Sequence, residues 1–374
     1  MKKLLKNLFC AGLMAVSGLA FAAKKSIVCV TYPEYDWVMN ILGNKASKFK
    51  VSLLQNNGSD LHSYQPSVKD IAKIATCDML VYVGGESDEW VEKALANATN
   101  KNMTVVNLVE SLGDKVKEEE VVEGMEHHHD HDAHGHDHDD HDHDAHGHDD
   151  HDHDHDAHGH DDHDDHDHDD HDHDAHGHDH DDHDHDAHEH EHDHEHEKDE
   201  HVWLSLKFAA ELTNVLSEKI QKLDSANASL YKANTAAYVK ELSDLDALYE
   251  KTVASSSKKT LLFGDRFPFR YLADDYKLTY FAAFTGCSAE SEASFETVVF
   301  LAKKIDDLGL NSILTIEKSD KKIARTIISN TKNKNQQVLE MDSLQSVTEK
   351  DIKSGRNYLS AMKNNLEVLK SALK

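Results

Sequence analysis

The stretch GSDLHSYQPSVKDIAKIATCDMLVYVGG, residues 58–85, contains the signals that decide the fold of this chain. Ser67 followed by Asp70 forms a capping-box pattern, so the sequence predicts a helix over 68–75. The apolar run 79–83 that follows is typical of a buried strand. A helix that leads directly into such a strand is one unit of an alternating α/β fold.

The same alternation of apolar runs and helical patterns recurs in both halves of the chain. The runs predict strands at 26–30, 49–54, 79–83 and 104–108, and again at 260–263, 278–284, 312–316 and 337–340. Helical patterns fall at 37–42, 68–75 and 90–98, and again at 267–275, 294–308, 321–330 and 358–373. Each half therefore predicts a mostly parallel sheet with helices on both faces.

A long helix is expected to join the two halves. After a helix over 206–222, apolar and tyrosine side chains repeat at helical spacing over 227–253, a length of roughly 40 Å at 1.5 Å per residue. We predict an α/β fold of two lobes, 23–225 and 258–374, with a rigid linker helix within 226–257. Ligands of open α/β sheets bind beyond the carboxyl ends of the strands, so the cleft between the lobes is the predicted site.

Residues 127–196 have a composition unlike the rest of the chain. This tract contains 31 of the 33 histidines and 30 of the 71 acidic residues, and none of the 40 lysines and arginines. With no Leu, Ile, Val or aromatic residue it cannot offset the entropy of ordering, so we expect a disordered insertion in the first lobe. The remainder, with 41 acidic and 40 basic residues, lacks the basic surface that a nucleic-acid partner requires.

The N-terminus has the pattern of an export signal. Lysines precede an apolar stretch over 8–22, and Ala20-Phe21-Ala22 fits small-x-small cleavage, so residues 1–22 are predicted to be a signal peptide and the mature protein periplasmic. Cys10 lies well before that cleavage pattern and follows Phe9, which argues against a lipid anchor.

Three cysteines remain after cleavage. Cys29 and Cys77 adjoin apolar runs and are predicted to be small buried residues. One disulfide among Cys29, Cys77 and Cys287 could form, but three thiols cannot all pair within one chain.

Only two histidines lie outside the tract, His62 and His201. His62 lies in the loop before the Ser67 cap, and His201 just before a predicted cap at Ser205, so both are expected at loop–helix junctions that face the cleft. The second lobe offers further ligand types at its strand ends, namely Asp265, Cys287, Glu290 and Glu317. Two imidazoles with a carboxylate or thiolate suit Zn²⁺.

Two segments carry a resemblance to a known family: residues 58–85, quoted above, and DEHVWLSLKFA, residues 199–209. They are similar to segments of the zinc-specific substrate-binding proteins of bacterial ABC importers, the ZnuA-like, cluster A-I metal-binding family. The resemblance covers nearly all of the mature chain, and members often carry a His- and acid-rich loop before the second segment. It implies His62 and His201 as metal ligands, Zn²⁺ as cargo, an ABC permease in the inner membrane as partner, and a monomer without enzymatic activity.

The chain departs from the family's pattern in the second lobe. The third histidine of the family normally follows the first strand there, where LLFGDRFPFRYL, residues 261–272, has Gly264. The missing ligand must be absent or replaced by Asp265, Cys287, Glu317, a histidine of the tract, or water. Glu317 aligns with an acidic position that several members use as a ligand, so we favour it.

The favoured function is capture of Zn²⁺ in the cleft and its delivery to the permease, with the tract as a metal lure and buffer. A zinc hydrolase is one alternative, since an incomplete ligand set leaves room for water, although no catalytic zinc signature is present. A passive His-rich storage or adhesion protein is another. Manganese prefers more oxygen ligands, whereas nickel tolerates imidazole.

Overall fold

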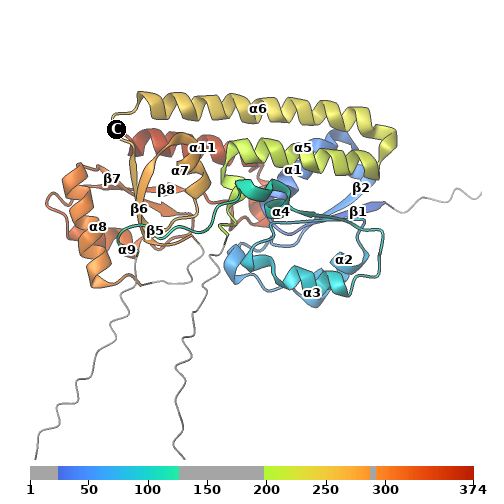
Figure 1. Ribbon diagram of the computed structural model, residues 1–374, viewed down its shortest axis with the longest axis horizontal. Coiled ribbons are helices and arrows are strands. Elements are labelled where there is room, and N and C mark those ends of the chain that lie inside the picture. The colour runs from blue at the N-terminus through green and yellow to red at the C-terminus, as the bar shows by residue number, and fades with distance from the viewer. Residues whose placement is uncertain (1–23, 126–197, 287–291) are drawn as a thin grey trace, which may run out of the picture. The chain divides into compact units, whose positions relative to one another are not determined.

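The structure, a computed structural model, describes residues 24–125, 198–286 and 292–374 (Figure 1). The described residues form two α/β lobes, each built on a four-stranded parallel sheet, which confirms the predicted fold class. The predicted signal peptide, the His/Asp-rich tract and Cys287 lie outside the described residues.

The N-terminal lobe contains the sheet β2-β1-β3-β4. The capping box at Ser67 forms as predicted and begins α2. The strands are β1 (Lys25–Cys29), β2 (Phe49–Leu53), β3 (Met79–Tyr82) and β4 (Thr104–Asn107). The helices are α1 (Tyr32–Leu42), α2 (Val68–Thr76), α3 (Trp90–Ala96) and α4 (Leu108–Leu112), with single turns η2 (Leu61–Ser63), η3 (Glu86–Asp88) and η5 (Val202–Leu204). α1 begins five residues earlier than predicted, because Thr31 and Glu34 form a capping box there.

The C-terminal lobe repeats the arrangement with the order β6-β5-β7-β8. Its strands are β5 (Thr260–Arg266), β6 (Thr279–Phe284), β7 (Ser312–Ile316) and β8 (Gln337–Met341). Its helices are α7 (Arg270–Tyr276), α8 (Phe295–Leu308), α9 (Lys322–Ser329), α10 (Glu349–Lys353) and α11 (Tyr358–Ala372). The short α10 was not predicted, because five residues are too few to show a helical period.

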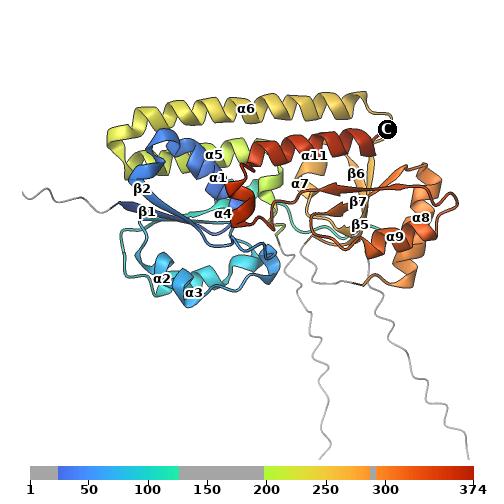
Figure 2. The ribbon, with the colours of Figure 1, turned by 180° about the vertical axis from the view of Figure 1, so that it is seen from behind.

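Two helices connect the lobes. α5 (Leu206–Leu223) is followed by α6 (Ala228–Ser255), which runs alongside both α5 and α11 (Figures 1 and 2). The side chains that predicted this helix are all buried on one face, namely Tyr231, Tyr238, Leu242, Leu245 and Tyr249. A helix that packs against both lobes is a stiff connection rather than a loose hinge.

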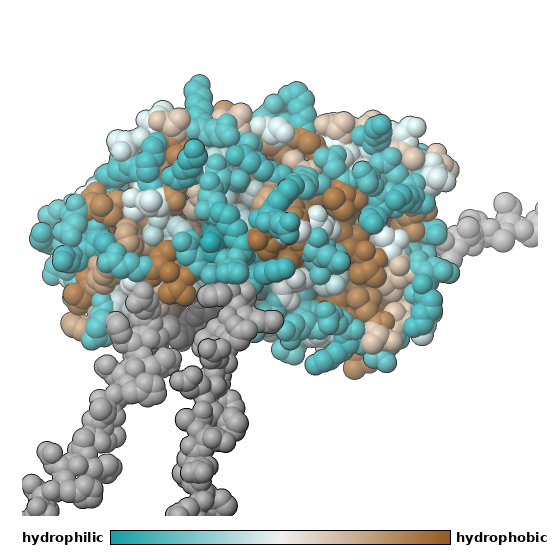
Figure 3. Space-filling model, viewed as in Figure 1, coloured by the Kyte–Doolittle hydropathy of each residue, from teal (hydrophilic) through white to brown (hydrophobic). Residues whose placement is uncertain are grey.

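Hydrophilic residues cover most of the surface shown in Figure 3, and the apolar ones form separate patches. Within the described ranges, no helix is both long and apolar enough to cross a membrane. Cys29 and Cys77 are buried free thiols, as predicted for small core residues.

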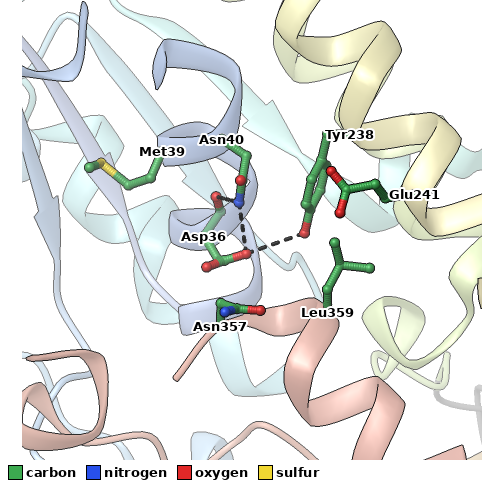
Figure 4. Close-up of a pocket in the computed structure, with 7 residues that line it drawn as sticks. All are labelled: Asp36, Met39, Asn40, Tyr238, Glu241, Asn357 and Leu359. Atoms are coloured by element: carbon green, nitrogen blue, oxygen red, sulfur yellow. Dashed lines mark hydrogen bonds between the residues drawn. The ribbon is translucent and has the colours of Figure 1, made fainter. Parts of the chain in front are cut away.

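A polar pocket of about 350 Å³ lies where α1, α6 and α11 meet (Figure 4). The Asp36 carboxylate points into it and accepts hydrogen bonds from Tyr238 Oη at 3.2 Å and Asn40 Nδ2 at 3.0 Å. Burial raises the pKa of Asp36 to about 6. The backbone amide of Tyr358, at the start of α11, also donates to this carboxylate, so Asp36 links helices from both lobes and the linker.

Candidate metal centre

His62 and His201, 139 residues apart in the chain, lie side by side at the start of short helical turns. Each is preceded by an aspartate that fixes the local backbone: the Asp60 carboxylate accepts from the His62 amide at 3.1 Å, and the Asp199 carboxylate accepts from the His201 amide at 2.9 Å. His201 is completely buried, and the His62 side chain is 11% exposed. The structure places the two non-tract histidines side by side, and their role as metal ligands stays a prediction.

The Nε2 atoms of the two imidazoles are 3.3 Å apart, and the ring centroids are 5.3 Å apart. Both rings therefore direct the same nitrogen toward one point. The two rings are tilted at 57° to each other, so this is not a stacking contact.

The opposite nitrogens of both rings are held by carboxylates. His201 Nδ1 is 2.9 Å from Asp199 Oδ1. His62 Nδ1 is 2.7 Å from Ser87 Oγ and 3.2 Å from Glu200 Oε1, and Ser87 in turn donates to Glu200. A carboxylate at Nδ1 favours the tautomer that carries its proton there, which leaves the Nε2 lone pair free for another partner.

The carboxylates around the two histidines shift the pKa values of the site in the directions expected for close pairs of imidazole and carboxylate. Burial alone lowers the pKa of His201, but Asp199 and Glu200 more than offset it and raise the pKa above its ordinary value. Burial raises the pKa of Glu200, but the hydrogen bond and charge of His62 outweigh it, so the net shift is downward. The site is therefore a negatively charged support around two imidazoles, which favours a cation.

The C-terminal lobe contributes an arginine and a glutamine to the same site. The Arg266 guanidinium lies 2.7 Å from the Asp60 carboxylate. The Gln345 amide lies between Asp60 and His201; in the orientation that satisfies both neighbours, its nitrogen donates to Asp60 at 3.2 and 3.3 Å, and its oxygen is 3.0 Å from His201 Nε2. These contacts join the two lobes around the histidine pair.

Glu317, the favoured third ligand from the sequence, directly follows β7 and holds a loop. Its two carboxylate oxygens accept from the Ser343 amide at 2.7 Å, the Ser343 hydroxyl at 2.8 Å, the Gln345 amide at 3.2 Å and the Ser346 amide at 3.3 Å. Burial and the neighbouring Asp342 raise the pKa of Glu317. Glu317 thereby fixes the backbone that carries Gln345.

Gly264 is explained by packing. A Cβ at this position would lie 2.7 Å from Ala324 Cα, so a side chain there would collide with α9. In this chain the position where the family pattern places its third histidine therefore has no room for a side chain unless α9 shifts. β5 has an irregular register between Phe263 and Arg266, and the side chain from this strand end that reaches the site is Arg266.

Of the two remaining candidate ligands in this lobe, the structure describes Asp265 but not Cys287. Asp265 accepts from the Arg266 amide at 2.9 Å through Oδ1, and within the described residues its buried Oδ2 has no hydrogen-bond partner. Cys287 lies outside the described residues, directly after Gly286, where a Cβ would approach His201 Cε1 to 3.1 Å.

In residues 24–125, 198–286 and 292–374, no three His, Cys, Asp or Glu side chains converge to hold a metal ion. The structure thus brings together His62 and His201, but groups neither Glu317 nor Asp265 with them. Sequence reasoning missed Ser87, Arg266 and Gln345. Only the acidic pair Asp199-Glu200, directly before His201, carried a local signal, since carboxylates commonly support histidine ligands.

The fold and the supported imidazole pair define a class of two-lobed metal-binding proteins, and comparison with known proteins gives the family. The family model described as ZnuA, zinc-uptake complex component A, periplasmic, matches residues 27–372. The chain therefore belongs to this family, as the resemblance predicted.

Individual relatives agree with this assignment. Zinc-binding protein AdcA of Streptococcus pyogenes serotype M3 is 25% identical over 353 residues, covering 93% of this chain and 56% of that protein, so the chain spans about half the length of this relative. The high-affinity zinc uptake system protein ZnuA of Bacillus subtilis is 25% identical over 350 residues, covering 94% and 88% of the two chains. The solved structure of the metal-dependent lipoprotein YcdH from Bacillus subtilis has a TM-score of 0.64 at 22% identity, covering 94% and 99%, and shows the same fold.

Proposed function

We propose that this protein carries one Zn²⁺ ion between His62 and His201 outside the inner membrane and delivers it to an ABC permease. The observation that carries the proposal is the 3.3 Å separation of the two Nε2 atoms. A tetrahedral zinc ion binds imidazole nitrogen at about 2.0–2.1 Å, which places two such nitrogens about 3.3–3.4 Å apart. The geometry of the pair fits the ion.

The tautomers of the two imidazoles also favour an ion between His62 and His201. Asp199 and Glu200 hold the Nδ1 sides of the two rings, so both Nε2 lone pairs face the same point. Two lone pairs at this distance repel each other unless a cation or a proton lies between them. A divalent ion would remove this repulsion and use both nitrogens at once.

Zinc is the cargo that the ligand chemistry and the relatives both favour. Imidazole nitrogen suits Zn²⁺ better than Mn²⁺, which prefers oxygen, although nickel tolerates the same ligands. The relatives named above are described as zinc-binding or zinc-uptake proteins. Membership of a periplasmic zinc-uptake family supports export and handover to a permease.

We further propose that residues 127–196 act as a metal lure and buffer for this site. The described chain resumes at Lys198, three residues before His201, and the Asp199 amide donates to the Lys117 carbonyl at 2.8 Å, so the chain on either side of the tract is tied together beside the site. Alternating imidazoles and carboxylates offer many overlapping ligand sets without fixed geometry. Such binding is multiple and weak, and it supplies ions to a preorganised pair nearby.

The test is a chelator-competition titration with zinc on a variant that lacks residues 127–196. His62→Ala and His201→Ala should each weaken the tight site by at least about tenfold, because each removes a direct ligand. Gln221→Ala, at a partly buried glutamine in the last turn of α5, is the matched control and should leave affinity unchanged. Unchanged affinity in both histidine variants would refute the site, and loss of the tight site on deletion alone would favour a storage protein.

A further inference from the structure

The Gln345 amide is oriented by its neighbours. The Asp60 carboxylate has acceptors only, so the amide nitrogen must face it, at 3.2 and 3.3 Å. The amide oxygen is then directed at His201 Nε2, 3.0 Å away. Gln345 is only 4% exposed, so no bulk water competes for this orientation.

The Gln345 amide oxygen and His201 Nε2 are close enough to share either a proton or a cation. With its proton held on Nδ1 by Asp199, His201 presents a lone pair at Nε2, and the Gln345 oxygen presents another. The same Nε2 atom also faces His62 Nε2 at 3.3 Å. Ligand atoms in a tetrahedral zinc site lie about 3.2–3.5 Å apart, and the two distances from His201 Nε2, 3.3 Å to His62 and 3.0 Å to Gln345, are within a few tenths of an ångström of that spacing.

We propose that Gln345 supplies a third zinc ligand through its amide oxygen, so that an ion bound to the histidines of one lobe is also bound by the other. This inference rests on the proposed zinc function and adds the contribution of the C-terminal lobe. Asp60 is the positioning residue, because its carboxylate turns the amide oxygen toward the ion.

Asp60 itself is not the third ligand in this arrangement. Its carboxylate is paired with Arg266 at 2.7 Å and accepts from the Gln345 amide nitrogen, so its oxygens already have partners. In the described part of the chain, no third His, Cys, Asp or Glu joins the two histidines. Within residues 24–125, 198–286 and 292–374, the Gln345 amide oxygen is therefore the oxygen that this site directs at His201 Nε2.

The loop that carries Gln345 is held rigidly enough to act as a ligand support. Leu344, directly before it, has φ 63°, a left-handed conformation that is costly for a residue with a side chain. Its side chain is 1% exposed, and Glu317 accepts four hydrogen bonds from the same loop. The surrounding structure thus imposes the conformation that directs the amide at His201.

The test uses the full-length chain at one equivalent of zinc, with a chelator strong enough to remove ions from weak sites. Gln345→Ala should bind zinc at least about tenfold more weakly than the wild type, because it loses a ligand atom. Gln345→Glu keeps an oxygen at the same reach but places its charge against Asp60, so it should recover part of the affinity that Gln345→Ala loses. Gln221→Ala, in the last turn of α5, is the control for removal of a glutamine side chain.

The variants distinguish this inference from the proposed function. Wild-type affinity in Gln345→Ala, with loss of affinity in His62→Ala, would overturn the ligand role of Gln345 and leave the histidine site intact. Equal weakening in Gln345→Ala and Gln345→Glu would also overturn it, since only the contact with Asp60 would then matter. No loss in any of these variants, His62→Ala included, would refute the site as a whole.

Discussion

Arg266 and Asp60 form an ion pair of 2.7 Å that joins the first strand of the C-terminal lobe to the loop of His62. The two side chains are 18% and 19% exposed, so the pair is largely shielded from water. The end of β5 that faces the histidines thus carries the positively charged Arg266 rather than a metal-binding side chain. The C-terminal lobe therefore contributes to the site through charge and through Gln345 rather than through a third imidazole.

Removing this cation should destabilise the metal-free protein. Arg266→Gln leaves the Asp60 carboxylate without its charged partner, and we expect a loss of about 1–3 kcal/mol in the free energy of unfolding. Urea denaturation at neutral pH measures it. Arg325→Gln, at an exposed arginine on α9, is the control and should change stability by less than about 0.5 kcal/mol. Equal stability of the two variants would show that the ion pair is not a structural link.

The carboxylates behind the histidines should control zinc affinity without binding the ion. Asp199→Asn removes the charged acceptor of His201 Nδ1, and the expected loss of zinc affinity is about 10–100-fold. Chelator competition on the tract-deleted protein measures it, with Asp244→Asn on the exposed face of α6 as the control. Wild-type affinity in Asp199→Asn would mean that the tautomer of His201 is set by something else.

The variant Glu317→Gln distinguishes two roles for Glu317: holding the loop of Gln345, or binding the zinc ion directly. If Glu317 holds the loop of Gln345, its amide substitute keeps part of the hydrogen bonding, and zinc affinity should fall less than in Gln345→Ala. Direct ligation by Glu317, which the family resemblance suggests, remains a prediction and would reverse this order. Asp265→Asn and Cys287→Ser should have little effect; a sulfur neighbour at about 2.3 Å in X-ray absorption would instead identify Cys287 as a ligand.

Asp36 should make stability depend on pH, away from the metal site. Burial raises its pKa to about 6 in the folded protein, so between about pH 4 and 6 the folded state binds the proton more tightly than the unfolded state. The stabilisation from this group is present below pH 4 and is lost as pH rises to 6. The difference in free energy of unfolding between Asp36→Asn and the wild type should therefore shift by about 2–3 kcal/mol in favour of the variant when the pH is raised from 4 to 7.5. Urea titrations at both pH values test this; a constant difference, as expected for the exposed Asp244→Asn, would contradict it.

Deletion of residues 127–196 should reduce zinc stoichiometry to about one tight ion. Growth should suffer only when zinc is scarce, because the tract is proposed to collect ions rather than to form the transport site. Its capacity should fall between about pH 7.5 and 5.5, because imidazole with a pKa near 6.5 must be neutral to bind metal. Calorimetry and growth under chelation measure these effects. Normal growth at limiting zinc would indicate that the tract has no role in uptake.

Local signals in the sequence were sufficient for most of the fold. Apolar runs and period-3.6 patterns, together with caps such as Ser67, identified every strand and most helices of the described residues; the five-residue helices α4 and α10 were not predicted. The two histidines could be paired because each adjoins a predicted cap and few other ligands were available. The C-terminal side could not be predicted, because Arg266 and Gln345 reach the site through a strand irregularity and a strained loop that leave no periodic trace.

We expect one zinc ion to bind between His62 and His201. Crystals of the zinc-loaded, tract-deleted protein, measured with anomalous scattering at the zinc edge, show where the ion lies. We predict a single strong peak about 2.0–2.1 Å from Nε2 of both histidines. A peak that contacts neither ring, with zinc bound elsewhere on the described chain, would rule out the histidine site.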